Sequence, residues 1–478
     1  MSRPGNSLFS AVDRPLGWFR GRKVTVMGLG RFGGGRGVTE FLCRQGAEVT
    51  VTDLESAESL APTLASMRDL PVHWALGGHR EDDFVRADLV VPSPAVPRDA
   101  ALLDLCRRRG VPLESEMNLF FKYCRGRICA VTGSNGKTTT TRLLGAMASR
   151  RWSGLRVGGN LGVSLLPEVE SIRAADWVIL ELSSFQLEDL RALPRRPEVC
   201  VVTNLSPNHL DRHGTYEAYI DAKRQIVAPG PPPDTAVLCA EDARLRSWAA
   251  RCGRRPVYFG RTGCVVPRAP GVWIDEERGE VFWSSSGERR LVFEVADLRL
   301  RGRFNLLNAA AAAAGAVILG VEAPDILAAV RDFLPVEHRL ELFLERSGVE
   351  YFDDSIATTP ESTIAALETL GPRVLLISGG ATKGCAFTSL AETIRRRARA
   401  VFLIGETAGD IEAACRSFRP CPPLFRSGTL ERALAAVREV AQPGDRVVLS
   451  PACPSYDQFP SFRERGLAFK GLVERVTR

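Results

Sequence analysis

Residues 128–140 read ICAVTGSNGKTTT, an apolar run followed by a glycine turn, a lysine and three threonines. Residues 128–132 have the composition of a buried strand, and the residues after the turn begin a helix. Such a turn holds phosphate with backbone N–H groups, Lys137 reaches the β and γ phosphates, and the Thr138 hydroxyl suits Mg²⁺. A strict phosphate-binding loop has glycine where this chain has Val131, so the match is to a variant. The stretch predicts an α/β domain that binds ATP.

Short β-branched runs alternate with stretches of helical period along the whole chain. This pattern is typical of βαβ units, in which helices cover both faces of a parallel sheet, so we expect the α/β fold class. The expected strands are residues 23–27, 48–52, 89–91, 128–132, 177–182, 199–204, 374–378, 400–404 and 446–449, with hairpins over 265–295 and a buried alanine-rich helix at 309–321.

The length of 478 residues favours three domains, which we place at 1–121, 122–336 and 337–478. We expect a charged linker at residues 114–122 between the first two, and the first twenty residues are an extension without an assigned role. Hydrophobic residues make up 45% and charged residues 25%, which excludes a disordered or membrane protein. No segment reaches the ~20 apolar residues of a membrane span.

Charge and cysteine content bear on the expected partners and on the cellular compartment. The net charge of +7 comes from 63 basic and 56 acidic residues, and the arginine clusters show no interleaved aromatic residues, so we expect no nucleic-acid partner. The 12 cysteines are scattered without a CxxC pair. Reduced thiols in the cytoplasm are the simplest interpretation.

A second glycine-rich motif lies near the N-terminus. After the run KVTVM, Gly28, Gly30 and Gly33 match G-x-G-x-x-G, and Asp53 closes the next expected strand. Glycines in this context allow close approach to a phosphate, and Asp53 is placed to contact a ribose or a base. Taken alone, the loop suggests an NAD-dependent oxidoreductase; a plain strand-to-helix turn is the alternative.

Polar residues follow two further expected strands. Glu181 ends WVILEL, where an acidic residue reaches a phosphate-bound Mg²⁺, although helix capping is the alternative role. His209 lies after the next strand and could bind metal through a neutral imidazole. As a bare lysine, Lys223 is expected to be solvated.

These motifs together closely resemble the Mur ligases, ATP-dependent amino-acid ligases that build the peptidoglycan precursor. The resemblance covers about residues 20–475, and the C-terminal stretch is similar to that of the branch that adds glutamate to UDP-N-acetylmuramoyl-L-alanine. The segments that carry it are TGSNGKTTT at 132–140, GGNLG at 158–162, ELSSFQLE at 181–188, NLSPNHLDRHGT at 204–215 and LSPACPSYDQFPSFRERG at 449–466.

The resemblance implies a Rossmann-like first domain that binds UDP and not NAD, a central P-loop ATPase-like domain and a Rossmann-like third domain. The implied UDP-sugar residues are Gly28, Gly30, Arg31, Phe32, Gly33, Asp53, Ser93 and Asn160. Arg31 and Phe32 are unusual residue types at their positions. The implied ATP residues are Gly133, Asn135, Gly136, Lys137, Thr138, Thr139, Asn305, Asn308, Arg339 and Asp354.

The resemblance also implies a catalytic set with two magnesium ions. Its members are Lys137, Glu181, His209, Lys223 and Arg339, and the metal ligands are Thr138, Glu181, His209 and Lys223. Lys223 matches the family lysine that carries a carbamate, which turns a cation into the oxygen ligand that Mg²⁺ prefers. His209 is also a candidate base for the amine proton, although a metal-bound imidazole cannot serve as a free base.

For glutamate, the matching residues are Thr358, Lys383, Ser455 and Phe462. Many members carry lysine where this chain has Ile356, which leaves the choice of D- or L-glutamate open. The resemblance implies a cytoplasmic monomer that uses ATP, glutamate and UDP-N-acetylmuramoyl-L-alanine. Rival interpretations are an L-glutamate-adding variant, another Mur ligase, a folylpolyglutamate synthase, an NAD-dependent oxidoreductase and a nucleotide-binding regulator.

Overall fold

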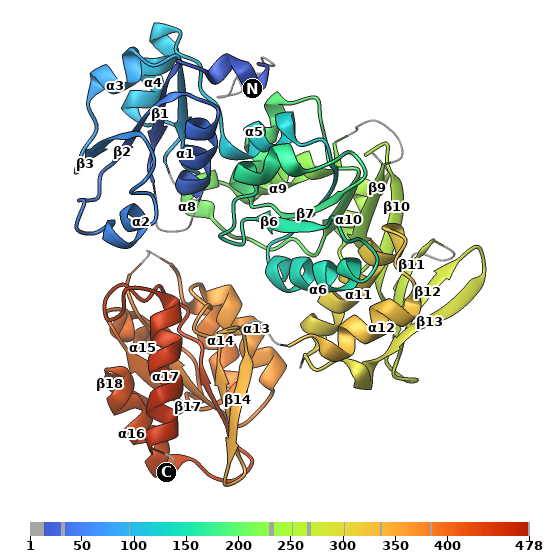
Figure 1. Ribbon diagram of the computed structural model, residues 1–478. Coiled ribbons are helices and arrows are strands. Elements are labelled where there is room, and N and C mark those ends of the chain that lie inside the picture. The colour runs from blue at the N-terminus through green and yellow to red at the C-terminus, as the bar shows by residue number, and fades with distance from the viewer. Residues whose placement is uncertain are drawn as a thin grey trace. The chain divides into compact units, whose positions relative to one another are not determined.

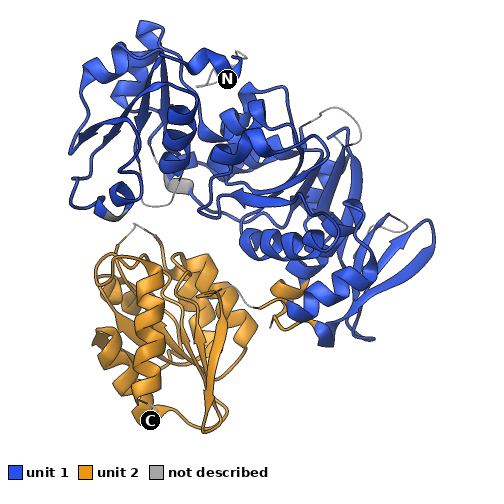
Figure 2. Cartoon of the chain, viewed as in Figure 1, with its two compact units in different colours: residues 1–297, 307–332 blue, residues 298–306, 333–478 orange. Residues whose placement is uncertain are grey.

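Three separate β-sheets organise the chain (Figure 1). The computed structural model describes residues 14–29, 34–94, 96–228, 234–250, 252–264, 269–300, 302–334, 337–382 and 385–476. The chain divides into two compact units, 1–297 with 307–332 and 298–306 with 333–478 (Figure 2). The first two sheets lie in unit 1 and the third lies in unit 2. The α/β class is confirmed, whereas the domain limits at 121 and 336 stay a prediction.

The N-terminal sheet is fully parallel, in the order β3-β2-β1-β4. Its strands are β1 (Lys23–Met27), β2 (Glu48–Asp53), β3 (Val72–Leu76) and β4 (Leu89–Pro92), and the helices that follow them are α1 (Gly34–Arg44), α2 (Ala61–Ala65), α3 (Glu81–Val85) and α4 (Ala101–Arg109). The buried pattern of β1 and β4 is that of strands covered on both faces. The short helix η1 (Leu16–Phe19) precedes β1 and buries Phe19 against Phe41 and Tyr123.

The segment expected to be a charged linker is a helix. Helix α5 (Glu116–Tyr123) begins at the N-cap Ser115, whose side chain accepts a hydrogen bond from the Asn118 N–H. The linker prediction was wrong because the apolar side chains within the segment, including Phe120 and Phe121, are buried. The two flanking charges are also buried, since Glu114 and Lys122 form an ion pair.

The central sheet has the order β13-β12-β11-β10-β9-β8-β5-β7-β6. Neighbours are parallel from β6 to β11, and β12 and β13 add an antiparallel hairpin at one edge. The strands are β5 (Arg127–Thr132), β6 (Arg156–Gly159), β7 (Trp177–Glu181), β8 (Val199–Val202), β9 (Thr235–Cys239), β10 (Arg255–Arg261), β11 (Gly271–Asp275), β12 (Glu280–Ser285) and β13 (Glu288–Glu294). The expected hairpins are confirmed within the described residues.

Helices of this region connect the strand ends that carry the candidate site. They are α6 (Lys137–Ser149), α7 (Ser184–Asp189), α8 (Leu210–His213), α9 (Tyr216–Arg224), α10 (Ala243–Ala249), α11 (Arg303–Ile318) and α12 (Ala323–Asp332). Helix α11 is the expected alanine-rich helix, and its alanines are fully buried. Because β5, β7 and β8 are adjacent and parallel, their carboxyl ends meet at one edge of the sheet.

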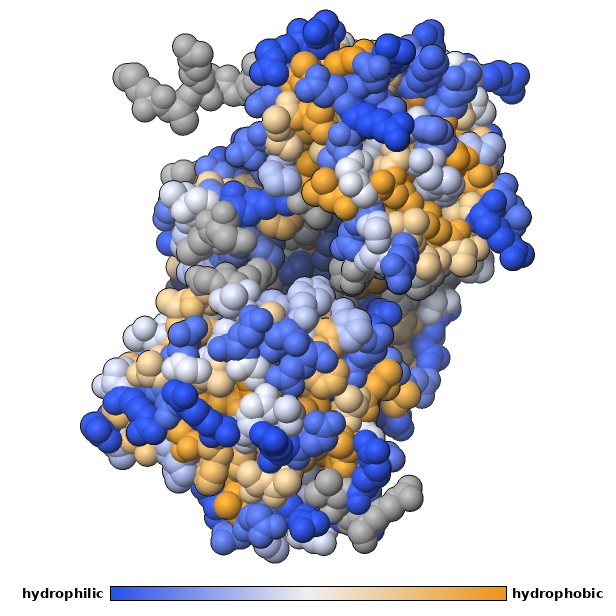
Figure 3. Space-filling view, turned by 90° about the vertical axis from the view of Figure 1, so that its left-hand side faces the viewer, coloured by the Kyte–Doolittle hydropathy of each residue, from blue (hydrophilic) through white to orange (hydrophobic). Residues whose placement is uncertain are grey.

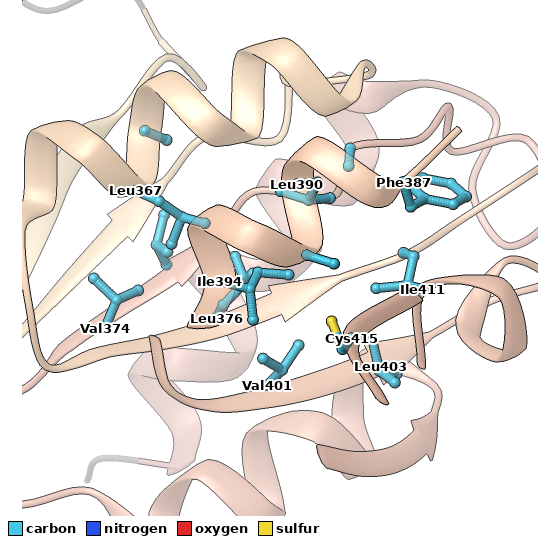
Figure 4. Close-up of a cluster of buried hydrophobic side chains, with 14 of the residues drawn as sticks. Leu367, Val374, Leu376, Phe387, Leu390, Ile394, Val401, Leu403, Ile411 and Cys415 are labelled. Atoms are coloured by element: carbon cyan, nitrogen blue, oxygen red, sulfur yellow. The ribbon is translucent and has the colours of Figure 1, made fainter. Parts of the chain in front are cut away.

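Unit 2 contains a six-stranded sheet, β14-β15-β19-β16-β17-β18, in which only β14 is antiparallel to its neighbour. Its strands are β14 (Glu341–Arg346), β15 (Val349–Asp353), β16 (Val374–Ser378), β17 (Ala398–Ile404), β18 (Leu424–Gly428) and β19 (Arg446–Leu449), and its helices are α13 (Pro360–Leu370), α14 (Thr388–Arg397), α15 (Ala408–Arg416), α16 (Leu430–Val440) and α17 (Phe462–Val476). On one face of the sheet, side chains such as Leu376, Val401 and Leu403 pack against Leu367, Leu390 and Ile394 of the helices (Figure 4). This packing stabilises the sheet whose strand ends carry the remaining candidate residues.

Hydrophobic and hydrophilic residues are interspersed on the face drawn in Figure 3. All 12 cysteines are free thiols. Among the described residues, no helix has both the length and the apolar character needed to cross a bilayer.

Candidate active site

The turn between β5 and α6 has the form of a phosphate-binding loop. Gly133 and Gly136 have φ values of 151° and 80°, which favour glycine. A Cβ atom at Gly133 would lie 1.8 Å from Thr203 Oγ1. The Lys137 ammonium donates to the Gly133 and Ser134 carbonyl oxygens over 3.0 and 2.9 Å. The lysine is therefore held against the backbone of its own loop.

The segment after β8 fixes this loop through side chains of a polar stretch that was expected at this sheet edge but was not among the predicted site residues. Asn135 N–H donates to Asn204 Oδ1 over 3.0 Å, and Asn204 Nδ2 returns a 3.0 Å bond to the Asn135 carbonyl. Thr203 Oγ1 donates to the same carbonyl over 2.6 Å. Ser134 Oγ receives bonds from Tyr219 Oη and from the backbone N–H of Ser206. The polar run TNLS after a buried strand is the signal that could have revealed this support.

Glu181 brings together residues from three segments. Thr138 Oγ1 donates to Glu181 Oε2 over 2.8 Å, and Asn160 Nδ2 donates to Glu181 Oε1 over 2.8 Å. Glu181 is 1% exposed at the end of β7. Neither donor carries a charge, and the carboxyl oxygens of Glu181 are of the kind that can also coordinate a hard cation.

Lys223 is buried on α9, contrary to the expectation for a bare lysine. Its side chain lies behind the phosphate loop, with Nζ 3.3 Å from Thr132 Oγ1 and 4.8 Å from the centre of the Tyr219 ring. Burial, aided by the positive charge of Lys137, lowers the Lys223 pKa well below its ordinary value, and Glu181 opposes this. The solvation prediction was wrong because α9 turns this residue toward the sheet, where it is 1% exposed. Burial therefore favours the neutral amine form of Lys223.

His209 precedes α8 in a left-handed backbone conformation, with φ of 53°. Its ring contacts Phe185 edge to face at a centroid distance of 5.1 Å. His213 stacks on the other side of that ring at 5.1 Å, and its Nε2 lies 2.9 Å from Ser184 Oγ. Burial lowers the His213 pKa, which favours the neutral imidazole. Phe185 and Ser184 are neighbours of Glu181 whose roles sequence reasoning missed.

The predicted adenine-side residues lie on α11. Asn308 is 4% exposed, and its amide is so close to the phosphate loop that a Cβ at Gly136 would lie 2.1 Å from Asn308 Oδ1. Thr139 is also buried, in the first turn of α6. Asn305 is 6% exposed and belongs to the part of α11 that groups with unit 2. Helix α11 therefore carries residues of both units.

Gly28, Asp53 and Ser93 meet at the carboxyl ends of β1, β2 and β4. Gly28 has φ of 86°, and a Cβ there would lie 3.1 Å from Ser93 Cβ. Asp53 Oδ2 accepts a 2.8 Å bond from the Leu29 N–H, and Oδ1 accepts a 2.9 Å bond from the Glu55 N–H. Asp53 thus shapes the turn around Gly28. The predicted residues Gly30, Arg31, Phe32 and Gly33 lie outside the described residues.

In unit 2, one buried arginine joins two of the loops that lead to predicted residues, and the predicted Phe462 is the first residue of α17. Arg465 is 1% exposed and donates to the carbonyl oxygens of Ser355, Cys453 and Pro454 over 2.9, 3.1 and 3.2 Å. It thereby joins the loop leading to Thr358 with the loop that carries Ser455. Ser355 Oγ also donates to the Phe462 carbonyl over 2.7 Å. Sequence reasoning missed Arg465, and the predicted Lys383 lies outside the described residues.

Arg339 and Asp354 form a second polar group in unit 2. Asp354 accepts bonds from the Leu340 N–H over 3.0 Å and from Ser450 Oγ over 2.7 Å. Burial raises the Asp354 pKa to about 7, and the Arg339 charge opposes the shift.

Close by in the chain, His338, Glu341 and Asp353 lie within 4.8 Å of one another. The Lys470 ammonium is 2.7 Å from Glu341 Oε2 and 3.8 Å from Asp353 Oδ2, and His338 Nδ1 is 2.7 Å from Asp353. The Lys470 ammonium thus pairs with Glu341 and Asp353, and the His338 ring contacts Asp353, so the cluster has the character of an internal polar network.

Comparison with known families assigns all three parts of the chain. Residues 22–114 match the Mur ligase MurD-like N-terminal domain, residues 131–316 the Mur ligase middle domain, and residues 338–453 the Mur ligase glutamate ligase domain. The first and third ranges enclose the N-terminal sheet and the sheet of unit 2, and the middle range begins within β5 and covers the rest of the central sheet.

Curated relatives match along nearly the whole chain. UDP-N-acetylmuramoylalanine–D-glutamate ligase from Roseiflexus sp. (strain RS-1) is 43% identical over 96% of this chain and 99% of the relative. The ligase of that name from Acidobacterium capsulatum is 38% identical, with 95% and 96% covered.

Solved structures share the fold at lower identity. UDP-N-acetylmuramate-alanine ligase MurC from Thermotoga maritima has a TM-score of 0.61 at 20% identity, and 95% of this chain and 100% of that chain are covered. A pseudomurein peptide ligase type C from Methanothermus fervidus has a TM-score of 0.60 at 19% identity, with 95% and 100% covered.

Proposed function

The chain belongs to the Mur ligases, in the branch of the UDP-N-acetylmuramoylalanine–D-glutamate ligases, and on that premise we propose that it joins D-glutamate to UDP-N-acetylmuramoyl-L-alanine. ATP drives the reaction, which makes the chain an acid–amino-acid ligase of peptidoglycan precursor synthesis. The observation that carries the proposal is the convergence of Lys137, Thr138, Glu181 and Lys223 at the carboxyl ends of β5, β7 and β8.

The donor set around Glu181 fits Mg²⁺. A threonine hydroxyl and a carboxylate are hard oxygen ligands, and the 2.8 Å distance between Thr138 Oγ1 and Glu181 Oε2 supports their joint use. We propose that Thr138, Glu181, His209 and carboxylated Lys223 hold two magnesium ions. When bound, magnesium neutralises charge on the ATP phosphates. Lys137 adds a fixed positive charge on the loop side.

Lys223 is suited to carbamate formation. A neutral amine nitrogen attacks the carbon of CO₂, a C–N bond forms, and one proton leaves to solvent. Burial favours the neutral amine that this step requires, as the lowered pKa of Lys223 indicates. The product is an anionic oxygen ligand beside Glu181. A ¹³C-carbamate NMR signal, present in the wild type and absent in Lys223→Met, would support the assignment.

The ligase chemistry needs an activated carboxylate. We propose that an oxygen of the alanine carboxylate attacks the γ-phosphorus of ATP, which releases ADP and leaves an acyl phosphate. The glutamate amine then attacks the acyl carbon, a C–N bond forms, phosphate leaves, and the amine gives up a proton. Lys137 and Arg339 neutralise charge that develops on the transferred phosphoryl group. Asn305, Asn308 and Asp354 hold the nucleotide.

The remaining predicted residues are assigned to the UDP-sugar and to glutamate. We propose that the UDP-sugar binds at the turn after β1, where Ser93 lies close to Gly28 and Asp53 accepts a hydrogen bond from the Leu29 N–H. Asn160 contacts the muramoyl-alanine part while it holds Glu181. Glutamate binds in unit 2, where lysine and hydroxyl groups suit its two carboxylates; the proposed residues are Thr358, Lys383, Ser455 and Phe462.

We propose that the enzyme is a monomer in the cytoplasm. Its free cysteines fit a reducing compartment, in which its nucleotide substrates also occur. Light scattering on the eluting peak of a gel-filtration column tests the monomer directly.

Phosphate release from ATP and Mg²⁺ with UDP-N-acetylmuramoyl-L-alanine tests the activity, with D-glutamate and L-glutamate in separate reactions. Release that depends on D-glutamate is the expected result. It would also establish that Ile356 is compatible with the D-enantiomer. Release with L-glutamate alone would overturn the stereochemical assignment, and release with neither would overturn the substrate assignment.

A further inference from the structure

Two arginines join the segment after β4 to the helix that follows the Glu181 strand. Arg98 belongs to the N-terminal segment and reaches α7, whereas Arg212 belongs to α8 and reaches back to the Val96 carbonyl over 3.2 Å. Both segments are parts of unit 1. The contacts therefore cross between the region that carries Ser93 and the region that carries the metal ligands.

Arg98 is the more extensively bonded of the two. Its Nη2 donates to Asp189 Oδ1 and, over 3.3 Å, to the Phe185 carbonyl, and its Nε lies 3.3 Å from Glu188 Oε2. The Asp189 side chain is 6% exposed and that of Arg98 is 29% exposed. Burial raises the Asp189 pKa to about 7, and Arg98 is the first group that opposes this shift. Arg98 thus contacts Phe185, Glu188 and Asp189 of α7.

Phe185 connects the arginines to His209. The Arg212 guanidinium lies over the Phe185 ring at 4.3 Å from its centre. The same ring meets His209 edge to face at 5.1 Å and stacks on His213 at 5.1 Å. A shift of the Phe185 backbone, which Arg98 holds, would move the surface on which the His209 imidazole rests.

We propose that Arg98 is a positioning residue that locks the Ser93 segment onto α7, and thereby couples binding of the UDP-sugar to the orientation of His209. The inference rests on the proposed function, because it takes Ser93 as part of the UDP-sugar site and His209 as a metal ligand. Neither Arg98 nor Asp189 contacts the phosphate loop in this scheme. The affinity for ADP in the absence of Mg²⁺ should therefore be independent of the pair.

The test uses the full-length enzyme, four single variants and one double variant. Arg98→Met removes the guanidinium group and keeps an aliphatic side chain of similar length. Arg98→Lys keeps the positive charge but not the planar guanidinium with its several donors, and Asp189→Asn removes the negative charge of the partner. Arg86→Met is the matched control, because Arg86 is an exposed arginine of the same region with a single surface ion pair to Asp82. Calorimetry gives Kd for UDP-N-acetylmuramoyl-L-alanine and for ADP without Mg²⁺, and phosphate release gives kcat and KM.

For Arg98→Met we expect Kd and KM for the UDP-sugar to rise about tenfold and kcat to fall severalfold, while Kd for ADP stays within about twofold. Arg98→Lys should recover part of the loss. The double variant Arg98→Met/Asp189→Asn should be no worse than the more damaging single variant, because each single substitution already breaks the Arg98–Asp189 ion pair. Arg86→Met should match the wild type.

Three results would overturn the inference: an unchanged Kd for the UDP-sugar in Arg98→Met, equal losses for the UDP-sugar and ADP, or strictly additive effects in the double variant. Wild-type enzyme that binds the UDP-sugar without releasing phosphate would instead contradict the proposed function, and the binding comparison would still decide the role of Arg98. Wild-type enzyme that fails to bind the UDP-sugar would overturn both.

Discussion

Thr138 Oγ1 lies 2.8 Å from Glu181 Oε2, so the first turn of α6 is hydrogen-bonded to the carboxyl end of β7. Asn160 occupies the other carboxylate oxygen over 2.8 Å. Both bonds come from neutral donors, so neither of them places a positive charge against the buried carboxyl group. A divalent cation beside it would compensate the charge, which is the physical reason to expect a metal at this position.

Replacement of Glu181 by glutamine should abolish most activity. The amide removes one negative charge, and one of its two terminal atoms cannot accept the bond from Thr138 or Asn160 that a carboxylate oxygen accepts. We expect phosphate release to fall at least ~100-fold, with a higher Mg²⁺ requirement for any remaining rate. Glu168→Gln is the control, because Glu168 pairs with Arg156 at the surface. Near-normal activity of Glu181→Gln would contradict the metal assignment.

Lys223→Met should lose activity but have a higher melting temperature than the wild type in CO₂-free buffer. The folded protein binds fewer protons at Lys223 than the unfolded chain, because burial lowers its pKa below the ordinary value of 10.5. The free energy of unfolding of the wild type should therefore rise as the pH approaches 10.5, because the lysine of the unfolded chain then loses its proton as well. The variant lacks this component, so its melting temperature should exceed that of the wild type most clearly at neutral pH.

Bicarbonate separates this effect from ordinary packing. Added CO₂ should raise the melting temperature of the wild type, since a carbamate is the form that the site can use, and should leave Lys223→Met unchanged. The measurement is thermal unfolding followed by circular dichroism at several pH values. Equal bicarbonate responses of the two proteins would contradict the carbamate.

Asp354→Asn should flatten the pH dependence of unfolding. Burial raises the folded-state pKa of Asp354 to about 7 from an ordinary value of 3.8. A raised pKa means that the folded protein holds this proton more tightly, so the contribution to stability is complete below pH ~4 and is lost as pH rises through 7. The amide resembles the protonated acid, and its advantage over the wild type should grow across this window to the order of 4 kcal/mol. A constant difference between the melting temperatures of the two proteins would contradict the shift.

The sequence predicts the strands of the site well because their signal is local. The apolar runs around residues 128–132 and 177–182 are buried on both faces of the sheet, and β5 and β7 match them within one residue at each end. The half-buried strands β3 and β18 lack a long apolar run and were not predicted. The interior strands β9 and β15 were not predicted either, so the apolar pattern missed short buried strands as well as edge strands.

Contacts between distant segments were harder to predict. Nothing near Lys223 in the sequence indicates burial, because its neighbours on α9 include charged residues and the sheet it faces is formed from other segments. Likewise, Asn160 was expected to contact substrate, and its bond to Glu181 depends on the pairing of β6 with β7. Arg98 gave no signal, since its partners lie about ninety positions away.

Gly136→Ala should weaken nucleotide binding through two effects that a second glycine separates. Gly136 has φ of 80°, and a Cβ there would lie 2.1 Å from Asn308 Oδ1, so the substitution adds backbone strain and also displaces the amide from the phosphate loop. Gly110 has φ of 73° at the end of α4, with nothing within 4 Å of the added Cβ.

Gly110→Ala therefore introduces the strain alone, at a cost of about 1 to 2 kcal/mol in stability, with ADP affinity unchanged. Gly136→Ala should lower the melting temperature by at least as much and should raise Kd for ADP with Mg²⁺ about tenfold or more, because Asn308 must move. The double variant Gly136→Ala/Asn308→Ala makes room for the methyl group. If its melting temperature does not recover relative to Gly136→Ala, the close approach of Asn308 to the loop is not what makes glycine necessary there.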